Sequence, residues 1–287
     1  MNEDKLTKEE TTIVNLFIAN ELILSKYYKD VMANQARNKR ILKERLIANI
    51  ESHSSSDDFL IPYGRSGQAE FREELAEAIA IVDDSEFTKF IRKQVMYPYT
   101  PLDKIKLLIY TELVIASQGY ANTLMIGWSE IINKTLGEVE DKERIRNLIL
   151  ALAWADGRDI LTFYDRVLLN GYRVAQSMVR EITSEVVGGV RLSTVDTIIN
   201  KRYRIQGNDL KRVIETSSTF YTNNTFFEKY SILYGVNLWR HVSILDERTT
   251  ELCWSRHGKV WETRELVQGV TIPPLHYRCR SILMPVL

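Results

Sequence analysis

The chain has 287 residues, which is long enough to bury a substantial core and to form one to three domains. Lysine plus arginine number 38, as do aspartate plus glutamate, so the formal net charge is zero. This balance excludes a global electrostatic attraction to nucleic acid or to an anionic membrane and leaves only local patches as candidates for such contacts.

Neither an export signal nor a membrane-spanning segment is predicted. The first ten residues are polar and charged, whereas a secretory signal needs an apolar run. The most apolar stretch, from Ile105 to Trp128, is interrupted by Lys106 and Glu112, so we expect a buried helix there. With two cysteines in all, we expect a reducing compartment, in which a structural disulfide is not the first expectation.

Helical periodicity dominates the first two thirds of the sequence. Thr7 and Glu10 have the spacing of a capping box and begin a helix that we expect to end near Val31. Further helices are predicted over residues 38–50, over 68–82, from Ser85 to a point before Pro98, and over 102–128, 139–155 and 159–187. Two glycines, Gly188 and Gly189, close the last of them.

The character of the sequence changes near its C-terminal end. A short helix over about 194–203 and a longer one over 208–234 are predicted first, and Gly235 ends the second. Strand candidates follow at 236–244, 259–261 and 280–284. The sequence therefore predicts a predominantly α-helical α+β fold, in which a helical body precedes a small C-terminal α+β module with short antiparallel strands.

We divide the sequence into three regions on this basis. Residues 1–100 form an N-terminal helical region that ends at the proline-rich break around Pro98 and Pro101. Residues 101–188 form a central helical body, and residues 189–287 form the C-terminal module. Trp239, Trp254 and Trp261 are the aromatic residues that we expect in the core of this module.

Both cysteines and two of the four histidines lie close together in the C-terminal module. Three residues separate Cys253 from His257, and two separate His276 from Cys279. Paired donors on two turns are how a structural zinc site is commonly assembled, so a Cys2His2 zinc site is one hypothesis. Two alternatives remain open, because the cysteines can also be plain buried side chains or a disulfide in an oxidising setting.

Asp246 lies on the predicted turn that follows the first strand. Its carboxylate can accept hydrogen bonds from backbone amides or from Arg280, and such a pair would fix the geometry of the hairpin. A catalytic alternative uses Asp246, His257 and His276 to hold a hydrolytic metal ion or to supply an acid and a base. Nothing else in the sequence completes a nuclease or protease constellation, so we favour the structural interpretation.

The order of these residues resembles the signature of a known family. The pattern reads Asp246-x-Arg248-Thr249-Thr250-x-x-Cys253, then His257-Gly-Lys259, then Pro273-Pro274-x-His276-x-x-Cys279-Arg280 and a final Pro285. It resembles the C-terminal signature of the tailed-phage head morphogenesis proteins, the minor head proteins similar to protein F of phage Mu and to a head protein of phage SPP1. The resemblance covers about residues 189–287 and includes Arg212, Asn223 or Asn224, and Trp239.

This resemblance implies a structural protein of the virion that is assembled in the host cytoplasm. Its implied partners are the portal protein, capsid or scaffold subunits and the packaged DNA, and its implied roles are procapsid assembly and genome packaging or ejection. Members of the family frequently end the signature Cys-Arg-Cys, whereas this chain has Ser281 at the last position. If a metal binds here, we expect His257 to supply the fourth donor.

A local excess of positive charge precedes the signature. Between residues 191 and 215 the basic side chains outnumber the acidic ones by three. The candidates for contact with DNA phosphates are Lys201, Arg202, Arg204, Lys211 and Arg212. Such contacts would be non-specific and would weaken steeply with salt, and the sequence has no base-reading motif. A solvated helix face is the favoured alternative.

We therefore expect a minor capsid or head morphogenesis protein that is not an enzyme, with zinc as a candidate cofactor. The rival class is a metal-dependent nuclease or hydrolase that is carried in the virion and delivered with the genome.

Overall fold

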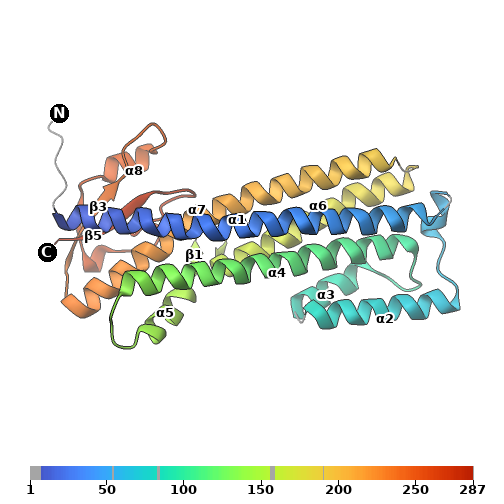
Figure 1. The fold of residues 1–287 in the computed structure, drawn as a ribbon, viewed down its shortest axis with the longest axis horizontal. Coiled ribbons are helices and arrows are strands. Elements are labelled where there is room, and N and C mark those ends of the chain that lie inside the picture. The colour runs from blue at the N-terminus through green and yellow to red at the C-terminus, as the bar shows by residue number, and fades with distance from the viewer. Residues whose placement is uncertain (1–7, 54, 83–84, 156–158, 190, 287) are drawn as a thin grey trace. The chain divides into compact units, whose positions relative to one another are not determined.

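The computed structural model describes residues 8–53, 55–82, 85–155, 159–189 and 191–286. Its helices are α1 (Lys8–Glu51), α2 (Arg65–Val82), α3 (Ser85–Gln94), α4 (Pro101–Leu136), α5 (Lys142–Leu150), α6 (Phe163–Val187), α7 (Leu192–Tyr234) and α8 (Glu251–Arg256), with short 3-10 helices at Asp57–Leu60 and Thr263–Glu265 (Figure 1). Its strands are β1 (Trp154–Ala155), β2 (Ile160–Leu161), β3 (Leu238–Ser243), β4 (Val260–Glu262) and β5 (Ser281–Pro285).

These elements confirm the predicted fold class. Helices account for 72% of the described residues, and the C-terminal strands form one antiparallel sheet in the order β4-β3-β5. Among the described residues, no helix combines the length and apolar character that crossing a membrane requires.

The chain folds into two compact units that do not follow the sequence order. Unit 1 contains Met1–Asp30, Asn122–Arg166 and Leu210–Leu287, and unit 2 contains Val31–Ala121 and Val167–Asp209. The boundaries fall inside α1, α4, α6 and α7, so each of these helices contributes residues to both units.

Unit 2 is a helical assembly with one hydrophobic core. Side chains from α1, α2, α3, α4, α6 and α7 contribute to it, among them Leu42, Phe71, Ile91, Leu113 and Met178, all at most 2% exposed. The apolar residues recur at helical spacing along each of these helices, so burial of one stripe per helix accounts for the packing.

Helix α1 is continuous, whereas the sequence analysis predicted two helices with a break between Val31 and Asn38. Residues 32–37 contain neither glycine nor proline, so nothing forces the helix to end there. The buried side chain of Gln35 also holds this segment in place, because its Nε2 donates to the carbonyl of Tyr203 at 3.2 Å and to Gln206 at 3.1 Å. The predicted capping box at Thr7 and Glu10 lies outside the residues whose side chains the structure describes.

Helix α7 is continuous too, although we predicted a break near residues 204–207. Gly207 lies inside the helix, where a Cβ atom would approach the side-chain oxygen of Gln35 to 3.0 Å. The glycine therefore permits a close approach to α1 and does not end the helix. Sequence alone does not show this neighbour, so the predicted helices ended at about Tyr203 and began again at Asn208.

The prediction for residues 139–187 was partly wrong. Helix α5 ends at Leu150, and residues 154–155 and 160–161 form the two-stranded sheet β1-β2 instead of helix. The indole of Trp154 is 2% exposed and donates to the carbonyl of Pro274 at 3.2 Å. Trp154 is thus held by a contact with a residue 120 positions away, which the local sequence pattern does not show.

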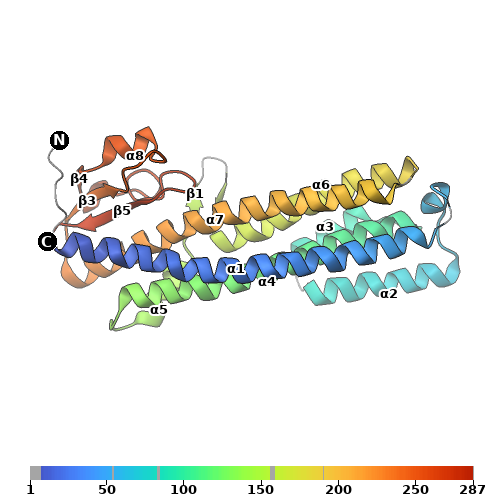
Figure 2. The ribbon, with the colours of Figure 1, turned by 45° about the horizontal axis from the view of Figure 1, so that its top comes forward.

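In unit 1, one face of the C-terminal sheet packs on two helices. Ile282 and Met284 of β5 contact Phe17 of α1 and Phe226 of α7, and all four side chains are at most 2% exposed. Figure 2 shows β3 and β5 beside the first part of α1, although these segments lie near opposite ends of the sequence. The sheet therefore obtains its hydrophobic cover from both ends of the chain.

The opposite face of the sheet carries buried side chains of β3 that lie near the candidate site. Trp239, His241 and Ser243 alternate on β3 and are at most 5% exposed. Directly across on β5, Leu283 pairs with His241 and Ser281 pairs with Ser243. Partners on neighbouring antiparallel strands point to the same side, so these side chains share one buried face.

Two glycines in unit 2 provide a matched test of this packing. An alanine Cβ at Gly171 of α6 would lie 2.0 Å from the hydroxyl of Ser117, whereas nothing lies within 4 Å of the Cβ position at Gly119 of α4. We predict that Gly171→Ala lowers the free energy of unfolding by about 1–3 kcal/mol because of the clash. Gly119→Ala should raise it by roughly 0.5–1 kcal/mol. Urea denaturation of both variants checks the prediction, and equal effects would contradict it.

Candidate metal centre

A short helix that the sequence analysis missed places Cys253. Helix α8 begins after Thr250, whose side-chain oxygen accepts a hydrogen bond from the Cys253 amide. A threonine with this role is a typical N-cap. Cys253 is 3% exposed, whereas Trp254, which we expected in the aromatic core, is 50% exposed. The helix therefore turns the cysteine inward and the tryptophan outward.

The loop before β5 places His276 and Cys279, and helix α7 holds its backbone. The Arg278 amide donates to the hydroxyl of Thr216 at 2.9 Å, and the hydroxyl of Thr219 donates to the carbonyl of Cys279. Arg278 has a φ of +61°, a conformation that ordinary residues seldom adopt. The two threonines thus fix a strained turn between the two candidate ligands.

Aromatic contacts fix the other side of this loop. The ring of Tyr277 meets Trp154 edge to face, and the guanidinium of Arg212 lies 4.4 Å from the centre of the Tyr277 ring. Arg166 is 6% exposed and donates to the Tyr277 hydroxyl at 3.2 Å. These contacts leave the loop little freedom to carry His276 away from Cys279.

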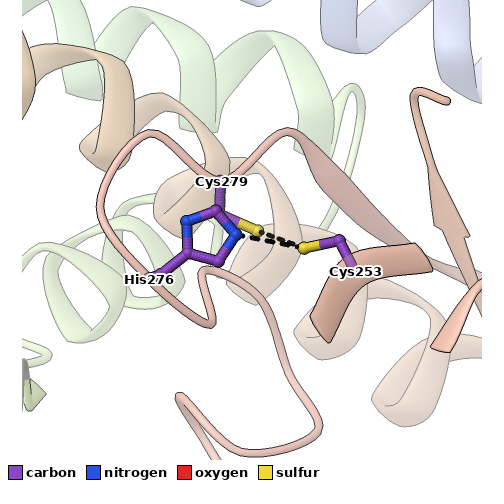
Figure 3. A group of neighbouring side chains, drawn as sticks. All are labelled: Cys253, His276 and Cys279. Atoms are coloured by element: carbon purple, nitrogen blue, oxygen red, sulfur yellow. Dashed lines mark hydrogen bonds between the residues drawn. The ribbon is translucent and has the colours of Figure 1, made fainter. Parts of the chain in front are cut away.

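Cys253, His276 and Cys279 meet in one cluster (Figure 3). Their ligand atoms all lie within 4.8 Å of one another. The Cys253 Sγ lies 3.8 Å from the Cys279 Sγ and 3.1 Å from the His276 Nε2. Figure 3 shows His276 and Cys279 extending from the loop toward the cysteine of α8. The structure thus brings together three of the four donors that the sequence analysis selected.

The tautomer of His276 suits a metal ligand. Its Nδ1 lies 2.8 Å from the carbonyl of Tyr277, which can only accept, so Nδ1 carries the proton of that contact. In the neutral ring, Nε2 is then the atom with the free lone pair, and it faces Cys253. Metal-bound histidines typically donate their second N–H in this way.

The two thiols share their protons unequally. A hydrogen bond from Cys279 and contacts with His241, His276 and Ser281 hold the pKa of the Cys253 thiol well below its usual range, although burial acts in the opposite direction. The contact with Cys253 and burial raise the pKa of Cys279 well above its usual range. The hydrogen bond with Cys253 also raises the pKa of His276. Ionisation is therefore favoured at Cys253 over Cys279.

This donor set fits a zinc ion. Two Zn–S bonds of about 2.3 Å at a tetrahedral angle place the sulfur atoms roughly 3.8 Å apart. The Cys253 and Cys279 sulfurs already have this separation. Sulfur and imidazole nitrogen are the ligands that structural zinc sites use, and the cluster contains no carboxylate among the described residues. Cys253, His276 and Cys279 are the residues that could hold the ion.

The structure places His257, the predicted fourth donor, outside this cluster. Its side chain is exposed at the end of α8, and its Nδ1 accepts a hydrogen bond from the Ser243 amide at 3.1 Å. The ring therefore links α8 to the end of β3.

The remaining signature residues lie beside the cluster. Arg280 donates two hydrogen bonds to Asp246, at 2.8 and 2.5 Å. Asp246 also accepts from the Arg248 amide, and its own amide donates to the hydroxyl of Thr249. The side chain of Arg248 is exposed, and the carbonyl of Pro274 accepts from Trp154. The carboxylate thus links the turn after β3 to the start of β5.

The predicted phosphate-contacting residues lie along α7. Lys201 and Arg202 both pair with Glu181 of α6, and Lys211 lies 3.9 Å from Glu215. Arg212 stacks on Tyr277, and Arg204 is exposed. Several of these charges are thus balanced by neighbouring carboxylates, and their contact with DNA stays a prediction.

Residues 176–284 match the family described as phage Mu protein F like protein. This region is a phage Mu F-like domain. The match begins in α6 and ends inside β5, so it contains α7, the sheet and all three clustered donors. It confirms the resemblance stated from the signature residues.

The Mu F-like domain belongs to a family of structural proteins of phage head morphogenesis, the minor capsid proteins. No curated protein and no solved structure proved similar enough to match the chain.

Sequence reasoning missed the role of Asn223. Its Nδ2 donates to the carbonyl of Ser281 at 3.1 Å, and its Oδ1 accepts from the Leu283 amide at 2.6 Å. The carboxamide therefore forms hydrogen bonds with backbone groups on the edge of β5 that faces away from β3, as a neighbouring strand would. The resemblance named Asn223 or Asn224 without a role, and the cluster of polar residues in the middle of a helix was the available signal.

Replacing Asn223 should destabilise the Mu F-like domain. Asn223→Ala leaves a buried carbonyl and a buried amide without partners, which should cost about 2–4 kcal/mol. Asn224 is the matched control, because it is buried and its Nδ2 donates within α7, to the carbonyl of Phe220. Hydrogen exchange of the β5 amides checks the prediction, and similar losses of protection in both variants would contradict it.

The Asp246–Arg280 pair should make stability depend on pH. The hydrogen bond from Arg280 holds the pKa of Asp246 well below its usual range. Its contribution is therefore complete above the unfolded pKa of about 4 and is lost as pH falls toward the folded value. Asp246→Asn should lower the urea midpoint of tryptophan fluorescence at pH 7, and the deficit should shrink at pH 3. Glu247→Gln is the neighbouring control, and a deficit that does not change with pH would refute the prediction.

Proposed function

We propose that this chain is a structural minor capsid protein of a tailed bacteriophage. In this proposal it associates with the portal vertex and acts in procapsid assembly and in genome packaging or ejection. The observation that carries the proposal is the Mu F-like domain in residues 176–284. The portal protein and the capsid or scaffold subunits are the proposed partners, and the virion, assembled in the host cytoplasm, is the proposed location.

In the proposed protein, residues 189–287 act as a rigid module. Two of its signature residues hold the backbone in place. Thr250 caps α8, and Asp246 joins the turn after β3 to the start of β5 through its hydrogen bonds with Arg280. A zinc ion bound by Cys253, His276 and Cys279 would join α8 to the loop before β5. Such a crosslink stabilises a small sheet that buries a limited apolar area. Rigid presentation of this module to neighbouring subunits is what the proposal requires of it.

Contact with packaged DNA is the less specific part of the proposal. The exposed Arg204 and the half-exposed side chains of Lys201 and Lys211 are available to phosphate groups on α7. Their neighbouring carboxylates reduce the local positive charge, so any binding should be weak, non-specific and sensitive to salt.

A metal-dependent nuclease or hydrolase is the alternative function. The observation in its favour is that the described cluster has three donors, which is the number that catalytic zinc sites use. Against it, the proposed acid and base groups are engaged elsewhere, because Asp246 binds Arg280 and His257 binds the Ser243 amide. Cleavage of DNA by the purified, zinc-loaded protein would favour this alternative.

Co-expression tests the proposed function. The chain is produced together with the portal, scaffold and major capsid proteins of its own phage, and the procapsids are purified. We predict that it copurifies with procapsids that contain the portal and is lost from those assembled without it, since the proposed binding site is the portal vertex. Asn223→Ala should reduce incorporation, whereas Asn224→Ala should not.

Incorporation that does not depend on the portal would refute the vertex location. Absence from all procapsids would refute the structural role.

A further inference from the structure

A tetrahedral ion bound by Cys253, His276 and Cys279 needs a fourth donor. The cavity next to these residues has a volume of about 10 Å³ and is lined by Cys253, His276 and the hydroxyl-bearing Thr249 and Thr250. This volume accommodates about one water molecule. The fourth ligand is therefore either a single water or a protein side chain that reaches the ion from the buried side.

His241 is a buried imidazole whose polar atoms lack an explanation. It is 0% exposed on β3, and among the described residues neither of its ring nitrogens has a hydrogen-bond partner. Its ring touches Trp261 edge to face at 5.8 Å between centres. A buried polar atom is costly unless it is hydrogen-bonded or bound to a metal, so two such atoms on one ring require a reason.

The position of His241 supplies a reason for one of these two atoms. It lies on the same buried sheet face as Ser243, whose hydroxyl donates to the Cys253 carbonyl at 3.0 Å. Side chains two residues apart on a strand point to the same side, so the buried imidazole lies beside the hydroxyl that holds the Cys253 backbone. An unpartnered, fully buried histidine thus lies next to the residue that binds the Cys253 backbone, on the sheet face that this cysteine approaches.

We propose that His241 is the fourth ligand of a closed zinc centre formed with Cys253, His276 and Cys279. This inference rests on the zinc centre proposed above and changes its chemistry, because four protein ligands leave no open position for substrate. A Cys2His2 centre of this kind is structural. It joins three parts of the domain, namely strand β3, helix α8 and the loop before β5.

The competing side chains are less suitable donors. The hydroxyls of Thr250, Ser243 and Ser281 lie nearby, but hydroxyl groups keep their protons at neutral pH and are not typical zinc ligands. His257 is exposed, and one of its ring nitrogens is used by the Ser243 amide. Among the described histidines near the cluster, His241 therefore has both the free nitrogens and the burial.

The experiment measures metal binding by the purified full-length chain. Zinc content is determined by mass spectrometry, zinc affinity by competition with a chelating dye, and geometry by the visible spectrum of the cobalt(II) form. We expect one zinc per chain and the intense bands of four-coordinate cobalt with sulfur ligands. His241→Ala should weaken zinc binding by about a hundredfold or more, since losing even an outer-shell partner costs roughly 10–100-fold.

Two variants keep the result interpretable. His257→Ala is the matched control and should leave zinc affinity and the cobalt spectrum unchanged. His241→Cys replaces one donor by another, so it should restore zinc binding and add a sulfur-to-cobalt band. Recovery by this variant separates loss of a ligand from loss of folding.

The possible failures are distinguishable. Zinc binding that survives His241→Ala with an unchanged cobalt spectrum would overturn the role of His241 and leave a three-ligand centre with water. Loss of zinc in His257→Ala would assign the fourth position to His257 instead. A wild-type protein that binds no zinc and has two freely titrating thiols would overturn the zinc centre itself, while portal-dependent incorporation would still stand.

Discussion

The C-terminal module depends on one constraint, which is that the backbone of its last strand must find hydrogen-bond partners inside the protein. Strand β5 pairs with β3 along one edge, and the carboxamide of Asn223 forms hydrogen bonds with its backbone along the other edge. Thr216 and Thr219 do the same for the loop before it. Because a buried amide or carbonyl without a partner is costly, the polar face of α7 determines where this loop and strand can lie.

The position of the candidate ligands follows from this arrangement. Cys279 lies directly after the turn that Thr216 fixes, and His276 lies directly before it. Cys253 approaches from α8, which ordinary N-capping by Thr250 orients. Each donor therefore depends on backbone contacts that exist without any ion, and the pKa of Cys253 is already lowered by its neighbours. A preformed site of this kind loses little conformational entropy on binding a metal, in contrast to a zinc finger that folds around its ion.

The sequence allowed the fold class, the three C-terminal strands and three of the clustered donors to be predicted, because scarce residue types and local periodicity carry this information. It failed where a distant partner decides the outcome. Helix α7 continues through the predicted break, where Gly207 lies close to Gln35, and Trp154, expected in a helix, lies in a short strand and contacts Pro274. His241 could not be selected for the same reason, since a lone histidine in a strand has no motif and only the folded structure shows that its ring is buried without hydrogen-bond partners.

The contacts of α1 have a consequence for synthesis of the chain. Phe17 packs against Ile282 and Met284, and Asn20 donates to the hydroxyl of Thr222, 202 residues further along. Segments this distant in sequence close slowly, and a ribosome delivers the N-terminal segment long before its partners. The apolar side of the first part of α1 therefore remains exposed until the final strand has been synthesised. During this interval the nascent protein is most vulnerable to aggregation and most in need of a chaperone.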